Sequence, residues 1–138
     1  MSESEARLMV VLRAALIVDA AVFLLAALLN FGAKIPLGFV ELNFPLAVWQ
    51  AGIGEAVIGL ALLAAAVTGR SAIAWGAFGL SVVGIVFGLS SARVQGPARE
   101  IHIVLVPLAV VVFALLLWVR QQRHRLRTEV LEPGMEKE

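Results

Sequence analysis

The stretch Gln50-Ala-Gly-Ile-Gly-Glu-Ala-Val-Ile-Gly-Leu-Ala-Leu62 decides how the chain folds. It belongs to an apolar run from Leu46 to Thr68 whose single charged residue is Glu55. A run of this length can cross the roughly 30 Å hydrocarbon core of a bilayer as a helix. Near the centre of that core an ionised acid costs about 2.5–3.5 kcal/mol. The sequence therefore predicts a membrane helix whose glutamate faces other helices, is protonated or has a partner.

The composition of the 138-residue chain indicates a lipid environment. Hydrophobic residues make up 61% of the sequence and charged residues 15%, against about 45–50% and about 25% in soluble proteins. The net charge of +1 gives no reason to expect nucleic acid as a partner. The absence of cysteine excludes disulfides, thiol redox chemistry and thiolate metal sites. A chain of this length has room for one domain.

Three further apolar runs accompany the first one. Together they predict four membrane helices, at about residues 7–30, 45–68, 72–91 and 97–119. A soluble helical bundle would need polar faces on its helices, and the run from Ile103 to Trp118 offers none. The connection from Gly69 to Ser71 is so short that the second and third helices must be antiparallel neighbours. The predicted fold class is all-α, a four-transmembrane-helix bundle.

The segment between the first two helices is expected to be irregular. Gly32, Pro36 and Gly38 interrupt the helical run between Asn30 and Phe44. Because the segment is unusually apolar for a loop, we expect it to rest at the membrane interface or to cap the bundle. It cannot lie deeper, since exposed backbone is not tolerated in hydrocarbon.

The distribution of lysine and arginine predicts the orientation of the bundle. With four crossings, one side holds both termini and eight basic residues, namely Arg7, Arg13, Arg70, Arg120, Arg123, Arg125, Arg127 and Lys137. The opposite side holds three, namely Lys34, Arg93 and Arg99. Both termini are therefore predicted to be cytoplasmic. The basic cluster at the start of the tail, residues 120–138, sets this topology and attracts anionic lipids, at about 1 kcal/mol per residue near the surface.

Two of the predicted helices carry small residues at helical spacing. In the third helix they are Ala77, Ser81, Gly84 and Gly88, and in the second Gly52, Ala56 and Gly59. Helices in lipid associate by close packing, and small residues allow two backbones to approach. These residues serve helix packing inside one bundle or, alternatively, form a face for a second chain.

Asp19 is the second acid expected inside the membrane. It lies on the same face of the first helix as Asn30. If this face meets the face of the second helix that carries Glu55, the carboxyl groups of Asp19 and Glu55 could share a proton. Each acid is either a structural group, hydrogen-bonded to a partner such as Ser81 or Gln50, or a proton- or cation-responsive site. Ionisable groups inside membranes are candidates for function by default.

The two histidines are predicted to lie far apart. His102 falls at the start of the fourth helix, beside Arg99 and Glu100, and His124 lies in the basic tail. About 33 Å of helix separates the two, so one chain cannot use them as paired haem ligands. One histidine with scattered carboxylates does not make a metal site. We expect His102 to be a solvated interfacial residue that titrates near neutrality, about 10 Å in depth from Glu55.

Two short motifs lie near the predicted membrane boundary. They are the loop Pro36-Leu37-Gly38-Phe39, which leads into the glycine-rich helix with Glu55, and Gly96-Pro97, which precedes Glu100 and His102. In these features the chain resembles small four-helix bacterial membrane proteins of unassigned function, over most of residues 8–119. The resemblance implies a bacterial inner (plasma) membrane and no particular chemistry. The chain departs from small multidrug exporters, whose essential glutamate lies in the first helix, where this chain has Asp19.

These features predict a non-enzymatic integral membrane protein. It would be an accessory or assembly subunit of a larger complex, or a self-associating bundle, with membrane lipids and other membrane helices as partners. The alternative is a small transporter or proton-coupled conduit that uses Glu55, with Asp19 as a second site. An enzyme has least support, because the sequence offers no recognisable nucleophile–base pair, catalytic residue or metal site. It names no cofactor.

Overall fold

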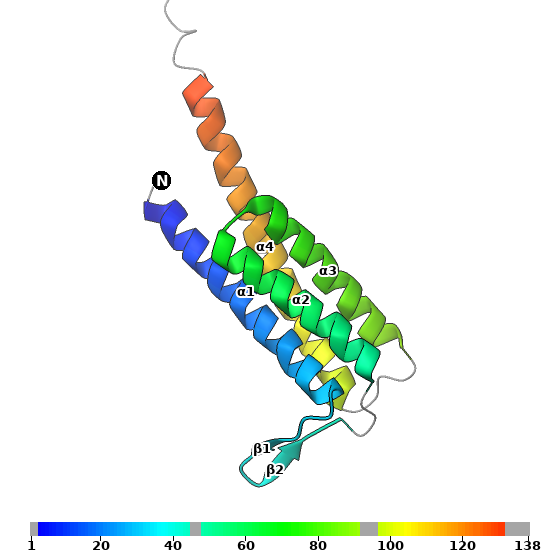
Figure 1. The fold of residues 1–138 in the computed structure, drawn as a ribbon. Helices are drawn as coiled ribbons and strands as arrows, with labels where there is room; N and C mark the ends of the chain where they lie inside the picture. Colours follow the sequence, from blue (N-terminus) through cyan, green and yellow to red (C-terminus); the bar gives the residue numbers. More distant parts are fainter. Residues whose placement is uncertain (1–2, 45–47, 92–96, 132–138) are drawn as a thin grey trace, which may run out of the picture.

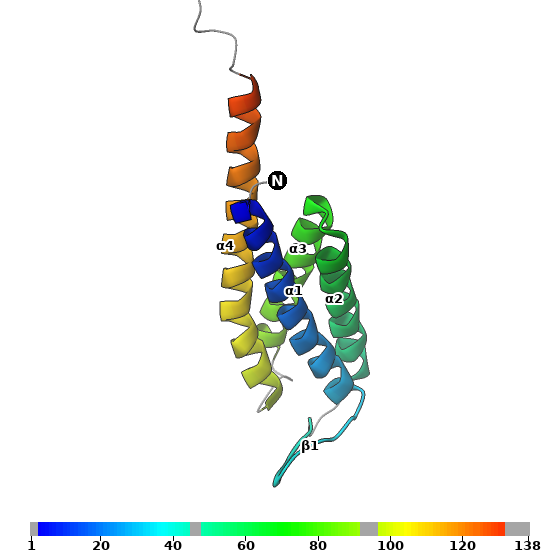
Figure 2. The ribbon, with the colours of Figure 1, turned by 90° about the vertical axis from the view of Figure 1, so that its left-hand side faces the viewer.

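Four long helices lie side by side in a computed structural model that describes residues 3–44, 48–91 and 97–131 (Figures 1 and 2). The elements follow in the order α1 (Glu3–Asn30), β1 (Ile35–Leu37), β2 (Val40–Leu42), α2 (Trp49–Thr68), α3 (Ser71–Ser90) and α4 (Pro97–Leu131). All four helices are long and apolar enough to cross a membrane. The predicted architecture, a four-helix integral membrane bundle, is confirmed. The side of the membrane that the termini face stays a prediction.

The turn between α2 and α3 follows from one glycine. Gly69 adopts a left-handed φ of 62°, and its N–H donates a hydrogen bond to the carbonyl of Ala65 at the end of α2. Glycine takes this conformation without the steric penalty of a side chain. Only Gly69 and Arg70 separate the two helices. We call this end of the bundle the tail end, and the opposite end, where β1 and β2 lie, the hairpin end.

The helix boundaries differ from the predicted ones by more than one residue at three places. Helix α1 begins at Glu3, before the predicted start at about residue 7. Helix α2 begins at Trp49, and the predicted start at residue 45 lies outside the described residues. Helix α4 continues to Leu131 instead of ending near residue 119, and it extends beyond the other helices (Figures 1 and 2). The prediction ended this helix where the apolar run ends. Arginine and glutamine are nevertheless good helix formers, so the helix can continue into water.

The segment predicted to be irregular contains a small hairpin. Strands β1 and β2 pair antiparallel with Ile35 opposite Leu42. The loop between them is Gly38–Phe39, and Gly38 has a φ of 67°, a conformation that favours glycine in two-residue hairpin loops. The hairpin projects from the end of the bundle (Figure 1), and the side chain of Phe39 is fully exposed. It therefore does not cap the helices.

The core of the bundle is aliphatic and closed toward the tail end. Its largest fully buried apolar side chains come from α1, α2 and α4, namely Leu16, Phe23, Leu29, Leu62, Leu105 and Val112. Large apolar side chains such as Val67, Val83 and Val110 are more than 60% exposed on the outer faces. An apolar outer surface of this extent marks a membrane protein.

Glycines bring α2 close to α1. A Cβ on Gly52 would lie 2.8 Å from the ring of Phe31, and a Cβ on Gly59 would lie 2.7 Å from the side chain of Leu24. Both separations are below normal contact, so only glycine fits at these positions without a shift. Ala56, between them, is half-buried.

The small residues of α3 also face the inside of this chain. Ala77 and Ser81 are buried. A Cβ on Gly84 would lie 3.3 Å from the ring of Phe23, and a Cβ on Gly88 would collide with the ring of His102. The ridge is thus occupied within the bundle, where helices in lipid use small residues for close packing.

Candidate functional site

Three buried polar side chains from three helices meet at the hairpin end. The Nδ2 amide of Asn30, the last residue of α1, donates a hydrogen bond of 2.8 Å to Oε2 of Glu55 on α2. The Nε2 atom of His102 on α4 lies 3.6 Å from Oε1 of the same carboxyl group. Glu55 is only 6% exposed and His102 only 4%. We call these three residues the carboxyl–imidazole cluster.

The backbone fixes the orientation of both partners of Glu55. The Oδ1 atom of Asn30 accepts a hydrogen bond of 3.2 Å from the N–H of Val48, which directs the Nδ2 atom toward Glu55. The Nδ1 atom of His102 lies 2.7 Å from the carbonyl oxygen of Ala98. A carbonyl oxygen only accepts, so Nδ1 carries a hydrogen, and in the neutral ring Nε2 is a bare lone pair that faces Glu55.

This arrangement accommodates one proton between the carboxyl and imidazole groups. With one proton the pair is either a carboxylic acid beside a neutral ring or a carboxylate beside an imidazolium, and both forms are neutral overall. Without it, the lone pair of His102 would face a carboxylate oxygen of Glu55 at 3.6 Å. Two acceptors that face each other in a buried site are unfavourable.

The expectation of a solvated His102 is wrong. Its ring is buried and contacts the carboxyl group of Glu55 directly. We expected the two side chains to lie about 10 Å apart along the membrane normal. The main reason is the start of α2. Glu55 is the seventh residue of a helix that begins at Trp49, about 9 Å from its first residue. It therefore lies toward the hairpin end and not near the centre of the span. Gly88, whose missing side chain leaves space for the ring, is the sequence signal that could have indicated the contact.

The cluster lies in a large groove between α2, α3 and the start of α4. The groove has a volume of about 690 Å³, and apart from the cluster it is lined mainly by apolar residues. Three of them, Val57, Val83 and Phe87, are more than half exposed on the outer faces of α2 and α3. The mouth of the groove therefore opens on the surface that faces lipid. A molecule in the bilayer can reach Glu55 and His102 from there.

Asp19 occupies a second buried site, nearer the tail end. It is fully buried, as is Ser81 on α3, and neither its carboxyl oxygens nor the Ser81 hydroxyl has a hydrogen-bond partner among the described residues. Asp19 lies one turn before Phe23, and Ser81 lies three residues before Gly84, which contacts Phe23. Helices α1 and α3 run in the same direction, so Asp19 and Ser81 share one depth in the core. We call them the inner pair.

The structure does not bring the two acids together. Gly52 packs beside Phe31 and Gly59 beside Leu24, which sets the register of α2 against α1. Glu55 therefore lies at the same depth as the part of α1 about seven residues after Asp19. This places the two acids about 10 Å apart along the helix axis. The helix face that carries Asp19 and the helix face that carries Glu55 both line the core, but at different depths. The two acids therefore cannot share a proton in this arrangement.

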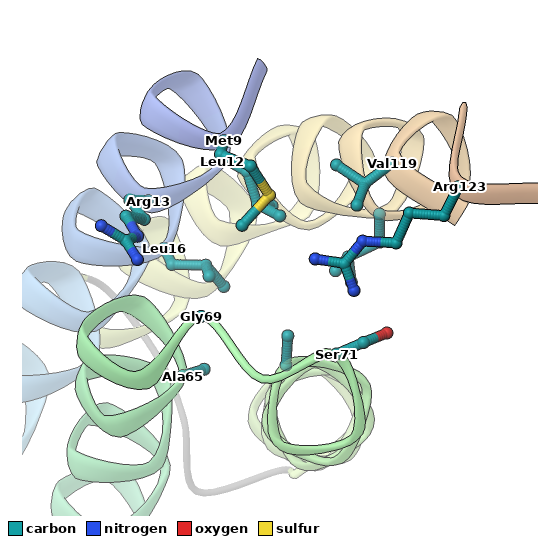
Figure 3. Close-up of a pocket in the computed structure, with 11 residues that line it drawn as sticks. Met9, Leu12, Arg13, Leu16, Ala65, Gly69, Ser71, Val119 and Arg123 are labelled. Atoms are coloured by element: carbon teal, nitrogen blue, oxygen red, sulfur yellow. The ribbon is translucent and has the colours of Figure 1, made fainter. Parts of the chain in front are cut away.

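Two arginines converge at the tail end of the bundle. Figure 3 shows Arg13 from α1 and Arg123 from α4, whose guanidinium groups extend toward the turn at Gly69 and Ser71. Both side chains are exposed, as the sequence predicted for arginines at a membrane boundary. The hollow that they share measures only about 10 Å³, enough for about one water molecule. This end therefore offers positive charge at the surface, and the hollow between the two arginines is too small for a ligand.

The other predicted site residues lie apart from these centres. Arg120 and Arg125 are exposed on the part of α4 that extends beyond the bundle. Arg127 is helical there, and its side chain is outside the described part of the chain, as are Arg93 and Lys137. Within residues 3–44, 48–91 and 97–131, no group of three or more His, Cys, Asp or Glu side chains could hold a metal ion.

No family model, curated protein or solved structure matches the chain. The resemblance to small four-helix membrane proteins is therefore supported at the level of architecture, by four long apolar helices, and no family is identified. Because an architecture of this kind serves many functions, the function has to be argued from the site.

Proposed function

We propose that this integral membrane protein is non-enzymatic and binds a small amphipathic molecule that enters from the lipid. The observation that carries this proposal is the carboxyl–imidazole cluster inside an otherwise apolar groove of about 690 Å³. Small-molecule sites typically measure about 300–1,000 Å³ and combine apolar walls with a few convergent polar groups. The polar head of such a molecule would contact Glu55 and His102, and its apolar body would pack against Val83 and Phe87.

The surroundings of His102 favour binding over catalysis. Its Nδ1 atom is occupied by a backbone carbonyl, and its Nε2 atom faces a carboxyl group. A general base in a nucleophilic mechanism would instead hold a hydroxyl or thiol within hydrogen-bond distance. In the described part of the chain no such contact to His102 is present, and the sequence contains no cysteine.

A small transporter or proton-coupled conduit that uses Glu55 is supported less well. A conduit needs an opening at both ends, and the core on the tail side of the groove is closed by fully buried leucines such as Leu16 and Leu62. Asp19, the second site of that alternative, lies within this closed region. Transport would require the helices to separate there.

One observation favours a second role, as an accessory subunit of a larger complex. Helix α4 extends beyond the bundle as a basic arm, residues 120–131, whose described side chains are mostly exposed (Figure 2). Such an arm can contact another membrane protein or anionic lipid headgroups; nucleic acid is not among the partners that we propose. Self-association through Gly84 and Gly88 is not favoured, because both face the inside of the bundle. A bacterial inner membrane and cytoplasmic termini belong to the same proposal.

Removal of the arm tests the accessory role. A chain that ends at residue 119 and the full chain would be extracted in mild detergent and compared by size. We expect the full chain to migrate in a larger species and the shortened chain to migrate as the bundle alone. If both migrate as a single bundle, the accessory role is wrong.

Photo-crosslinking in lipid nanodiscs tests the binding proposal. The probes are three photoactivatable twelve-carbon amphiphiles with a quaternary ammonium, a hydroxyl or a sulfate head. At least one probe should label residues around the groove more strongly than the outer face of α4. Val83→Trp, which fills the groove, should reduce this labelling at least tenfold. Val86→Trp should not, because Val86 is an exposed residue of the same helix that does not line the groove. Equal labelling in both variants would overturn the proposal.

A further inference from the structure

We propose that the molecule bound in the groove carries a cationic head group and that its binding releases one proton from the pair of Glu55 and His102. The inference rests on the proposed function, and it adds the charge of the ligand and a proton exchange. It is carried by the geometry of the cluster and by the charges that line the groove.

The empty site has a place for one proton between two acceptors. His102 presents a lone pair on Nε2 whenever its ring is neutral, because the Ala98 carbonyl holds the hydrogen on Nδ1. Glu55 presents Oε1 to the same point, 3.6 Å away. A proton on either atom relieves the repulsion between the acceptors and leaves the buried pair neutral, which a low-dielectric environment favours.

A cationic head group that lies in the groove beside the pair can supply the positive charge in place of this proton. Within the pair it would meet only acceptors, namely the two carboxylate oxygens of Glu55 and the lone pair of His102; the other polar residues that line the groove, Gln50 and Ser91, are neutral. The filled site would then contain a carboxylate, a neutral imidazole and one positive ligand, so it would again be neutral. Asn30 supports this state, because its amide donates to Oε2 and hydrogen bonds to an ionised carboxylate are stronger than those to a neutral group.

An anionic head group fits the same site less well. The described residues that line the groove include no lysine or arginine. An anion would require both Glu55 and His102 to be protonated at once. The amide of Asn30 already donates to Glu55.

A neutral head group would leave the proton where it is. No proton release is expected on its binding, and this difference separates a neutral ligand from a cationic one.

No other ionisable side chain in the described residues faces the pair. Helix α1 contributes the amide of Asn30, and α3 contributes Gly84, Phe87 and Gly88. On α4, Arg99 and Glu100 are exposed and do not line the groove. The proton balance is therefore simple: the N–H or O–H bond of the pair breaks, the cation beside the pair balances the charge of the carboxylate, and the proton goes to water.

Proton counting in nanodiscs tests the inference. The quaternary ammonium probe has no titratable hydrogen, so every proton released on its binding comes from the protein. A weakly buffered sample with an indicator dye should report about one proton per bound ammonium and none for the hydroxyl probe. While the empty pair holds its proton, the affinity for the ammonium probe should rise about tenfold per pH unit, as expected for the release of one proton.

Two substitutions of the same type provide the matched control. Glu55→Gln should abolish proton release and reduce the preference for the ammonium over the hydroxyl probe at least tenfold. Glu100→Gln should change neither, because Glu100 is an exposed acid at the same end of α4. The comparison of the three probes uses the wild-type protein, so it decides the question even if Glu55→Gln fails to fold.

The outcomes distinguish the inference from the function on which it rests. If the hydroxyl or sulfate probe labels the groove as strongly as the ammonium probe, or if ammonium binding releases no proton, the inference is wrong and ligand binding stands. If none of the three probes labels the groove, both are wrong.

Discussion

Glu55 and Asp19 are both carboxyl groups buried in one bundle, yet their surroundings differ. Glu55 accepts a hydrogen bond from Asn30 and contacts His102 beside a groove of about 690 Å³. Asp19 lies about 10 Å away along the helix axis, and its carboxyl oxygens have no hydrogen-bond partner in the described residues. Both acids are therefore buried. They differ because Glu55 lies beside a groove and has polar contacts, whereas Asp19 has neither among the described residues.

The position of each acid along the helices explains the difference. At the hairpin end, helix termini bring polar groups inward, because Asn30 ends α1 and His102 belongs to the second turn of α4. Gly88 makes room for the imidazole ring. Around the inner pair, full-length helices supply side chains such as Leu16 and Leu62 instead. A carboxyl group near helix ends can thus take part in a binding site, whereas the same group at mid-helix is enclosed.

Filling Gly88 should disrupt the carboxyl–imidazole cluster and leave the inner pair unchanged. Gly88→Leu places a side chain where the His102 ring lies, and overpacking of this kind costs about 1–3 kcal/mol. Thermal denaturation in detergent should show a clear loss of stability together with loss of groove labelling. The matched control is Gly79→Leu on the same helix, where no atom lies within 4 Å of the new Cβ. Equal melting temperatures for the two variants would contradict the packing of His102 against α3.

Replacing each acid with leucine tests the comparison directly. Glu55→Leu leaves the amide of Asn30 and the ring of His102 without their partner, and each unsatisfied buried group costs about 1–3 kcal/mol. Asp19→Leu removes a group that has no hydrogen-bond partner in residues 3–44, 48–91 and 97–131, so it should be neutral or stabilising by about 1 kcal/mol. Denaturation of both variants in the same detergent measures the difference. A greater loss of stability for Asp19→Leu would mean that the inner pair has a partner and holds the helices together.

The architecture could be predicted because the thickness of the bilayer sets how many consecutive apolar residues a membrane-spanning helix needs. Four apolar runs of sufficient length predict four helices, and Gly69 predicts the turn between α2 and α3. Glu55 could be singled out because it is the one charge in its run. Its partners could not be predicted in the same way. They depend on the register between helices, where a shift of four residues in the start of α2 moves a side chain by about 6 Å.

Two other features had no reliable signal in the sequence. The strands β1 and β2 are three residues each, too short for an alternating pattern to be recognised. The extension of α4 past residue 119 follows helix propensity in water, whereas the apolar run that marks the span has already ended. The sequence thus predicts the segments that the lipid determines, but not the structure outside the apolar runs or the contacts that depend on the register between helices.

A smaller effect should follow from the hydrogen bond between Asn30 and Glu55. Asn30→Leu leaves one buried group, Oε2 of Glu55, without its donor, at about 1–3 kcal/mol, and it removes the acceptor of the Val48 N–H, which is only partly buried. The melting temperature should therefore fall less than in Glu55→Leu. Asn43→Leu serves as the control, because the amide of Asn43 donates a hydrogen bond to the side chain of Glu41 in the hairpin, away from the cluster. If the two asparagine variants behave alike, Asn30 does not support the cluster.

The smallest effect is expected at the tail end, where charge lies at the surface and the hollow between Arg13 and Arg123 is too small for a ligand. Arg13→Gln and Arg123→Gln should each weaken the retention of anionic lipid by about 1 kcal/mol, the usual contribution of a basic residue near a charged membrane surface. Lipid that co-purifies with the protein, measured by native mass spectrometry, reports the change. Arg7→Gln is the matched control, because Arg7 is already paired with Glu3. Groove labelling should be the same in all three variants, since these arginines lie at the opposite end of the bundle from Glu55. A change in groove labelling would mean that the two ends are coupled through the inner pair.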